Sequence, residues 1–565
     1  MTTTALSGPA PSAPSPAARP KPAADAMPNY THRQILEILS GLLIAMFVAN
    51  VAGTVVANAL PVITARLGST QGQYTWIVTA TLLASTASTP IWGKLADLFD
   101  KKNLLLLGLG VFIAGSVASG AAPDTGWLIA ARALQGIGLG ALMSLIQAII
   151  GSVIPPLQRG RYMAYTGAVM ALATVAGPLI GGFIVDQPWL GWRWCFWSAV
   201  PFALIAMGVL QWRLRVPKLR VGQAKVDWLG AALITAAVSD LLIWISFVDK
   251  SFAYGSWQTA AMLSSTAVVT GLFILVESRV ADPILPLAIV RRPSTALAIV
   301  ASIAVGIGMF GSSVFLGQYF QVARGYSPTA AGLMMIPMMG GVMASSVFIG
   351  RWVSRVGVWK PFVIVGAAIL AAGFALMGMV DYTTPLWLIG VFGAVAGVGL
   401  GMTMQNLVLA VQNTVSVRDV GAASASVTFF RSLGGTIGIQ VLGTVFANHV
   451  TSLSSERLAA LHIDMGAAGG GASGSMSLNL DALPAPVAEA VRSAYGDSIG
   501  RVFLVAAAVS AISIACAALM KGTRLRSTFD LSPSAAEAEA KSDDSAATAL
   551  VEAVEELEPL ELAEE

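Results

Sequence analysis

Long apolar blocks separated by short loops constrain this chain more than any other feature. Each block is about 20 residues long, the length of a helix that crosses a hydrocarbon core of ~30 Å. Only 11% of the residues are charged, against about a quarter in soluble globular proteins. Because only helices and closed barrels satisfy their backbone groups in lipid, and the blocks lack strict alternation, the sequence predicts an all-α integral membrane protein.

The blocks define fourteen expected transmembrane helices. We place them near residues 36–61, 73–93, 103–121, 126–150, 162–185, 194–212, 228–247, 258–277, 295–320, 330–350, 360–380, 385–409, 425–448 and 500–520. Lys and Arg gather in alternate loops, which by the positive-inside rule face the cytoplasm. We therefore expect a multi-pass protein of a bacterial-type inner (plasma) membrane with both termini in the cytoplasm.

Three segments are too polar to cross a membrane. Residues 1–35 are rich in Pro and Ala, and we expect a disordered cytoplasmic tail. Residues 449–499 form an expected Gly- and Ser-rich outside loop. Residues 527–565 carry twelve of the chain's thirty carboxylates and are expected to be a disordered acidic tail in the cytoplasm.

Several function classes are excluded by what the sequence lacks. There is no Gly-rich loop followed by Gly-Lys-Ser/Thr and no segment that could house a nucleotide domain. No nucleophile–base pair stands out, and Cys195 and Cys516 lie far apart in apolar blocks without metal-ligand neighbours. We expect no enzyme, no cofactor, no metal site and no nucleic-acid partner, so transport would draw its energy from an ion or substrate gradient.

The first motif, Gly93-Lys-Leu-Ala-Asp97-Leu-Phe-Asp100-Lys101-Lys102, lies between the second and third spans. A carboxylate at a helix end can accept bonds from the exposed N–H groups of a neighbouring helix, and the basic pair can bridge to others. The string resembles the cytoplasmic-loop signature of the major facilitator superfamily, with Asp100 in place of a second Gly. We predict a gating latch; the alternative is ordinary positive charge around a loop aspartate.

Two further strings resemble signatures of the same superfamily. Arg132-Ala-Leu-Gln135 in the fourth span places a cation inside the membrane, which predicts a functional role unless Arg132 snorkels to the outer edge. In the fifth span, Gly177-Pro178-Leu-Ile-Gly181-Gly182 resembles the signature of the antiporter branch. Small residues four apart let helices approach closely, so close packing alone is the simpler interpretation.

Taken in order, the motifs over residues 36–520 resemble the fourteen-span drug:proton antiporter branch of that superfamily. A second, weaker copy of the loop motif begins at Gly350 and has Ser354 where the first has Asp97. The resemblance implies two six-helix bundles related by pseudo-symmetry. The expected domains are an N-terminal bundle at 36–220, two linker spans at 221–290, and a C-terminal bundle at 291–526.

The first span departs from this pattern, because Ala52 stands where that branch usually has an acid. The remaining candidates for a proton or charge relay are Arg132, Asp240 and Arg431. Proton coupling is expected at Asp240 or at a cytoplasmic carboxylate such as Asp97. Asp240 is about twelve residues into the seventh span, ~18 Å deep at 1.5 Å per residue. It is either a proton carrier or the partner in a structural hydrogen bond of the linker. Arg132 needs compensation, from Gln135, Asn50, water or an anionic substrate.

We expect a secondary active transporter that exports hydrophobic or amphipathic small molecules, such as drugs, antibiotics or secondary metabolites, by proton antiport and alternating access. Its partners would be that substrate, protons and the lipid bilayer, and it would act as a monomer. Alternatives are a lipid or siderophore exporter of the same fold, and a non-transporting membrane sensor or scaffold. Polar side chains at depths that suit a substrate cavity are Asn50, Asn58, Gln135, Gln405, Asn406 and Gln412.

Overall fold

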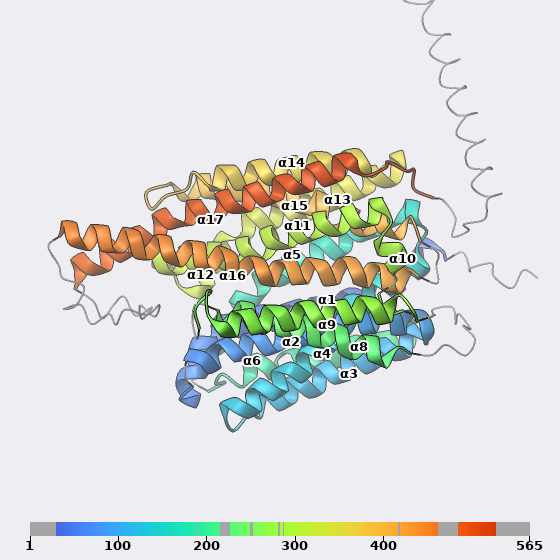
Figure 1. Ribbon diagram of the computed structural model, residues 1–565, viewed down its shortest axis with the longest axis horizontal. Coiled ribbons are helices and arrows are strands. Elements are labelled where there is room, and N and C mark those ends of the chain that lie inside the picture. Colours follow the sequence, from blue (N-terminus) through green and yellow to red (C-terminus); the bar gives the residue numbers. More distant parts are fainter. Residues whose placement is uncertain are drawn as a thin grey trace, which may run out of the picture.

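The computed structural model describes residues 30–69, 71–187, 189–214, 226–248, 252–280, 283–285, 287–415, 419–461 and 484–526, and these are mostly helical (Figure 1). In chain order the helices are α1 (His32–Leu67), α2 (Gln71–Leu98), α3 (Lys101–Gly120), α4 (Thr125–Val153), α5 (Pro156–Asp186), α6 (Trp194–Trp197), α7 (Ala199–Arg213), α8 (Trp228–Phe247), α9 (Trp257–Glu277), α10 (Leu287–Val290), α11 (Pro293–Gln318), η1 (Tyr319–Ala323), α12 (Pro328–Met334), α13 (Ile336–Val356), α14 (Lys360–Met377), α15 (Leu386–Gln412), α16 (Val420–Ala460) and α17 (Ala485–Leu519).

Thirteen segments of the described chain are long and apolar enough to cross a membrane. The remaining long helix is α2, whose 28 residues include several Ser and Thr between Thr79 and Thr89. It packs between α4 and α16 inside the assembly, where its hydroxyl groups are shielded from lipid. Counting α2, and counting α6 with α7 and α12 with α13 as single spans, the predicted order of fourteen spans is confirmed.

Short polar residues fix where many helices begin. The side chains of Asp100, Asp124, Asp227, Ser256 and Ser327 each accept a hydrogen bond from a backbone N–H in the first turn of the helix after them. The first N–H groups of a helix have no partner inside it, and such caps satisfy them. Each capping residue lies between an apolar block and the loop before it, so these polar residues determine where the helices begin.

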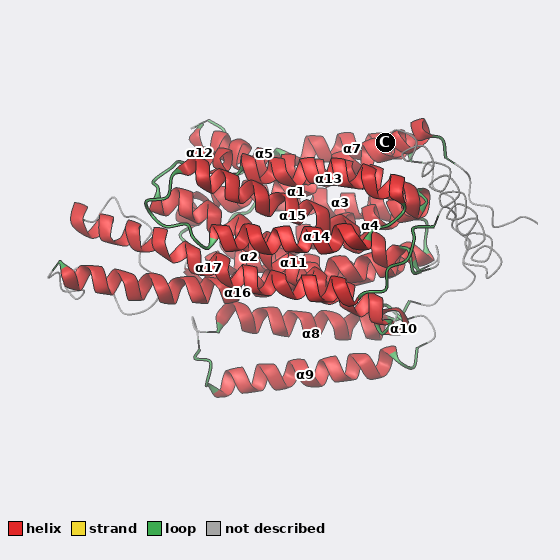
Figure 2. Cartoon of the chain, turned by 90° about the horizontal axis from the view of Figure 1, so that it is seen from above, coloured by secondary structure: helices red, strands yellow, loops and turns green. Residues whose placement is uncertain are grey.

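The helices form two halves, α1–α7 and α10–α17, which are blue to cyan and green-yellow to red in Figure 1. The two linker helices lie side by side at one edge, with α9 outermost (Figure 2). α8 packs against α2 of the first half and α16 of the second, whereas α9 packs mainly against α8. The predicted fold of two six-helix bundles and two linker spans is confirmed.

The two halves repeat the same helix contacts. In the first half α4 packs on α3 with Gly138 so close to Phe112 that an added β-carbon would lie 2.5 Å from the Phe112 backbone nitrogen. In the second half α15 packs on α14 with Gly399 against Leu370, where the corresponding distance is 2.2 Å. Matching close approaches at matching positions support the predicted pseudo-symmetry of the halves.

One predicted boundary is wrong. The sequence places a loop at 449–499, but α16 continues to Ala460 and α17 already begins at Ala485. These extra turns are rich in the helix formers Ala, Leu, Glu and Arg, and Leu458 packs there with Val487 and Ala490. The two helices therefore project beyond the others (Figure 2). At the other terminus α1 begins at His32, within the expected tail; residues 1–29 and 527–565 lie outside the described residues.

Candidate functional site

The first contact between the halves lies where α2 crosses α16. We call this end of the molecule the motif end, because it carries residues 93–102. The carboxylate of Asp97, only 8% exposed, accepts hydrogen bonds from the backbone N–H groups of Gly421 at 2.9 Å and Ala422 at 2.8 Å. A helix N-terminus has unpaired N–H groups and favours negative charge. An acid from one half thus caps a helix of the other.

Two glycines make this crossing close. A β-carbon at Gly93 would lie 2.2 Å from the β-carbon of Ala425. At Gly421 it would lie 2.3 Å from Oδ1 of Asp97 and 2.7 Å from the carbonyl oxygen of Gly93. Because Cβ atoms do not approach other heavy atoms this closely, a side chain at either position would force the helices apart and break the cap.

The basic pair of the motif is fastened beside the crossing. Lys102 donates from Nζ to the carbonyl oxygen of Gln211 at 2.6 Å, at the end of α7. Lys101 is 5% exposed and lies close enough to Asp97 and Asp100 to interact electrostatically with both. The buried carboxylate of Asp97 therefore has a cation beside it as well as two N–H donors, the setting that a buried charge requires.

A second crossing joins α5 to α13 at the same end. A β-carbon at Gly160 would lie 2.5 Å from the carbonyl oxygen of Gly350, and one at Gly350 would lie 2.2 Å from that of Gly160. The hydroxyl oxygen of Ser354 accepts a bond from the backbone N–H of Arg161 at 3.0 Å. Gly350 and Ser354 have the spacing of Gly93 and Asp97, so the weaker motif copy builds the same crossing with a hydroxyl in place of the carboxylate.

A third contact between the halves centres on Arg159, which is 1% exposed. Its guanidinium donates to Oε1 of Gln412 at 3.0 Å and also to the carbonyl oxygens of Ile154 and Gly151. Gln412 in turn donates to the hydroxyl of Ser424 at 2.7 Å. Gln412, expected in a substrate cavity, lies instead in a closed junction of α4, α5, α15 and α16.

Arg159 is not among the site residues predicted from the sequence, in which it is one of many cations that gather in alternate loops. The residue two positions later, Arg161, is exposed. The two side chains leave α5 in different directions: that of Arg159 is buried against Gln412 of the second half, whereas that of Arg161 lies in an exposed hollow beside α13. The one local signal is the start of α5 at Pro156, which places both residues near a helix start whose orientation the sequence does not specify.

The glycines of the fifth-span motif press α5 against two neighbours. A β-carbon at Gly177 would lie 1.8 Å from Oγ1 of Thr54, and one at Gly181 would lie 2.9 Å from the carbonyl oxygen of Val55, both in α1. Gly182 faces the other half, where an added β-carbon would lie 2.5 Å from Oγ1 of Thr329 in α12. The side chain of Pro178 lies outside the described residues.

Away from the motif end, a groove of about 560 Å³ lies between α2, α8, α11 and α16. Apolar side chains form most of its wall, and none of the described residues that line it is charged. The polar groups along it include Thr79, Trp244, Gln318, Gln440 and Thr444. The indole N–H of Trp244 has no hydrogen-bond partner among the described residues.

A family model described as "Major Facilitator Superfamily" matches residues 42–439, most of the chain. The chain belongs to the Major Facilitator Superfamily. It is therefore a multi-pass membrane transporter of small molecules rather than an enzyme, as the sequence predicted.

Individual relatives match this superfamily member over most of its length. It is 36% identical over 494 residues to an uncharacterized MFS-type transporter of Mycobacterium tuberculosis, covering 87% of this chain and 70% of the relative. It is 35% identical over 421 residues to the multidrug transporter protein MdtP of Bacillus subtilis, covering 74% and 77%. The efflux pump dotC of Dothistroma septosporum is 29% identical over 510 residues, covering 89% and 86%.

Solved structures support the fold. The proton:xylose symporter XylE superposes on this transporter with a TM-score of 0.57 at 13% identity, covering 89% of this chain and 99% of that one. The human organic anion transporter MFSD10 gives a TM-score of 0.54 at 14% identity, covering 84% and 99%. At such low identity the likeness extends to the arrangement of helices only.

The first of the transporter's three relay candidates, Arg132, lies within the first half. Its side chain is 5% exposed, donates to Oε1 of Gln135 and lies over the ring of Phe196. Gln135 passes the network on to Ser116 of α3 at 2.8 Å. Asn50, the other amide expected to compensate Arg132, donates instead to a carbonyl of its own helix.

Asp240 and Arg431 lie far from that network. Asp240 accepts a bond from the hydroxyl of Thr266 at 2.9 Å, which joins the linker helices α8 and α9 to each other. This geometry matches the structural alternative for Asp240. Arg431 is 7% exposed in α16, next to Gly306 of α11, and its guanidinium has no hydrogen bond or ion pair with the residues that the structure describes.

The remaining cavity candidates of the transporter differ in how well their polar groups are satisfied. Asn406 donates to the carbonyl of Met402 in its own helix at 2.7 Å. The side chain of Asn58 lies outside the described residues. Gln405 is 5% exposed, and neither its amide nitrogen nor its amide oxygen has a partner in the described part of the chain. Buried amides are normally hydrogen-bonded, so Gln405 stands out as a group that a ligand or water could satisfy.

Proposed function

We propose that this transporter exports hydrophobic or amphipathic small molecules in exchange for protons, by alternating access between the two halves. The groove between α2, α8, α11 and α16 carries the proposal. Its wall is mostly apolar, with a few hydrogen-bonding groups and no charge among its described residues, the composition that suits an amphipathic ligand without fixing its charge. Relatives named as a multidrug transporter and an efflux pump support export rather than uptake.

The distribution of charge supports an orientation. The motif end carries the loops rich in Lys and Arg, which by the positive-inside rule supports a cytoplasmic location for this end and for both termini, in a bacterial-type cell. In this orientation the described conformation is closed toward the cytoplasm by the two glycine crossings. The groove then lies in the outer half of the membrane, between helices that would separate when the substrate leaves.

Proton coupling is best assigned to Asp97. Its carboxylate holds Gly421 and Ala422 through bonds that need an acceptor on both oxygens. Protonation would convert one oxygen to a donor facing an N–H donor, which would weaken the crossing and favour opening. Asp240 is a weaker candidate, because its carboxylate joins only the two linker helices.

A substitution that fills the groove tests the substrate route. The β-carbon of a residue at 443 would lie 3.7 Å from the ring of Phe315, so Gly443→Phe can enter the groove without a clash at the backbone. We expect proton-driven uptake of neutral and amphipathic dyes into everted vesicles to fall at least about tenfold, since the groove's volume is comparable to that of a small ligand site.

The matched control is Gly208→Phe, because a β-carbon there meets no atom of the described residues within 4 Å. This variant should transport normally. Normal transport by a well-expressed Gly443→Phe protein would exclude the groove as the route. Transport that does not respond to collapse of the proton gradient would exclude antiport, and a full efflux panel without any exported compound would favour a sensor or scaffold.

A further inference from the structure

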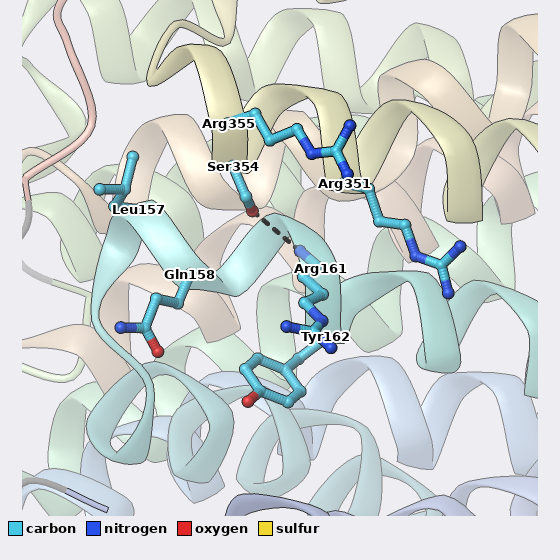
Figure 3. Close-up of a pocket in the computed structure, with 7 residues that line it drawn as sticks. All are labelled: Leu157, Gln158, Arg161, Tyr162, Arg351, Ser354 and Arg355. Atoms are coloured by element: carbon cyan, nitrogen blue, oxygen red, sulfur yellow. Dashed lines mark hydrogen bonds between the residues drawn. The ribbon is translucent and has the colours of Figure 1, made fainter. Parts of the chain in front are cut away.

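A basic pocket of about 470 Å³ lies at the motif end, between α5 and α13 (Figure 3). Arg161 lines it from α5, and Arg351 and Arg355 line it from α13. The other residues of its wall are Leu157, Gln158, Tyr162 and Ser354. Three cations therefore line one hollow, and none of the described residues of its wall is a carboxylate.

These guanidinium groups have no counter-charge in the described part of the molecule. All three arginines are exposed, and none of their side chains makes a hydrogen bond or an ion pair there. At the α2–α16 crossing, the acceptor is the acidic side chain of Asp97. At the α5–α13 crossing, the corresponding position is occupied by Ser354, which has no charge. Like charges gathered in a hollow favour an anion, and a guanidinium pairs with carboxylate in a bidentate geometry.

The chain itself leads to this pocket. After α17 it runs past the end of α13, where Leu525 donates from its backbone N–H to the carbonyl of Gly357 at 2.7 Å. Arg526 then donates from its backbone N–H to the side chain of Asn413 at 3.1 Å. Its carbonyl accepts from the backbone N–H of Leu157 at 3.0 Å, and Leu157 is part of the pocket wall. The last described residue therefore lies at the rim of the pocket.

The segment after Arg526 has the complementary charge. Residues 527–565 contain twelve carboxylates and a single Lys, and the last stretch, 552–565, reads EAVEELEPLELAEE. An extended chain spans up to ~3.3–3.6 Å per residue, so every acid of the tail can reach back to a pocket at the tail's own root. A tethered segment also acts at an effective concentration of ~1 mM, so modest intrinsic affinity suffices.

We propose that the acidic tail docks in this three-arginine pocket, through the glutamates of residues 552–565. Because Arg161 belongs to the first half and Arg351 and Arg355 to the second, a docked tail bridges the halves. It supplies at the α5–α13 crossing the negative charge that Asp97 supplies at the α2–α16 crossing.

The test measures the distance between the tail and the pocket in the full-length protein. Spin labels are placed on Trp352→Cys, which is exposed on α13 outside the pocket wall, and on Ala563→Cys in the tail; the native Cys195 and Cys516 are buried. In nanodiscs of zwitterionic lipid we expect a narrow, short distance population. It should be lost at ~1 M salt, where the screening length falls to about 3 Å.

Two variants and a control make the result specific. Replacing Arg161, Arg351 and Arg355 together with Gln should abolish the short population. Ser354→Asp should also abolish it, because an internal carboxylate then occupies the pocket. The matched control replaces three exposed arginines at the same end, Arg33, Arg279 and Arg291, with Gln; it removes the same net charge and should leave the short population intact.

Other outcomes overturn the proposal. A broad distribution in the unmodified labelled protein, or a short population that survives the triple pocket substitution, would show that the tail does not use this pocket. Loss of the short population in the control variant would show a diffuse charge effect. If the short population vanishes in nanodiscs of phosphatidylglycerol or in free phosphate at ~10 mM, the pocket binds a lipid headgroup or phosphate in place of the tail.

Discussion

The two helix crossings at the motif end have the same backbone geometry and different chemistry. In each, a glycine of one half meets a glycine of the other, at Gly93–Gly421 and at Gly350–Gly160. In each, a polar side chain one turn further on accepts from the first turns of the partner helix. The first acceptor is a buried carboxylate with two bonds, and the second is a hydroxyl with one.

This comparison distinguishes two contributions to the contact that closes the motif end, the distance of approach and the strength of the polar interaction. Glycine at both positions of both crossings sets how closely the helices approach, and this part is symmetrical. The polar group sets how strongly they hold, and this part is not: bonds to a charged group contribute about 1.5–3 kcal/mol each, against about 0.5–1.5 for a neutral pair. We therefore expect the α2–α16 crossing to carry most of the closing energy and the α5–α13 crossing to follow it.

The largest effects should come from bulk at the glycines. Gly421→Leu and Gly160→Leu both place a side chain within about 2.5 Å of atoms of the other half, so each should abolish transport even though only one crossing is charged. Gly110→Leu is the control, since a β-carbon there meets nothing within 4 Å. Initial rates in vesicles, corrected for the amount of protein in the membrane, check this. Near-normal transport by either variant would show that the crossings need not close.

A smaller and unequal effect is expected from the polar groups. Asp97→Asn should weaken the closed state by about 2 kcal/mol and Ser354→Ala by about 1, which corresponds to roughly thirtyfold and fivefold in the closing equilibrium. The measurement is the rate at which Gln147→Cys, buried in α4 and bonded across the halves, reacts with an impermeant maleimide. Equal rates for the two variants would remove the proposed asymmetry.

The smallest effect is expected at Asp240, which belongs to neither crossing. Its bond to Thr266 stays within the linker pair, and an amide can accept the same bond. Asp240→Asn should therefore change proton-driven transport by less than about twofold, within the ~0.5 kcal/mol typical of a substitution that preserves its contacts. A loss as large as that of Asp97→Asn would move the proton site into the linker and refute the assignment to Asp97.

Local features of this molecule could be read from its sequence. Apolar blocks predicted fourteen helices in the right order, because helix length in a membrane is fixed by the bilayer. Asp100 and Asp124 stand at helix starts where capping is a local requirement. The role of Asp97 as an acceptor could also be predicted, because the N-terminus of any neighbouring helix offers exposed N–H groups to a carboxylate.

Features that depend on how the halves meet could not be read in this way. Arg159 and Arg161 are two residues apart and chemically identical, yet one is buried in the junction and the other lines the basic pocket. Gln412 and Gln405 were equivalent candidates, but one bonds across the halves and the other has no partner in the described chain. Both outcomes depend on helix rotation, which is set by packing between distant segments rather than by the local pattern.

The unbroken course of α16 has a mechanical consequence. Its 41 residues make a rod of roughly 60 Å at ~1.5 Å per residue, with its first turn under Asp97, its middle in the wall of the groove and its last turns beside α17 outside the other helices. A rod that tilts by about 5° around the Gly421 contact moves its far tip by roughly 5 Å over that length. A protein that binds the tip formed by α16 and α17 would therefore restrict the tilt of α16, and through it the contact between Gly421 and α2 at the opposite face of the membrane.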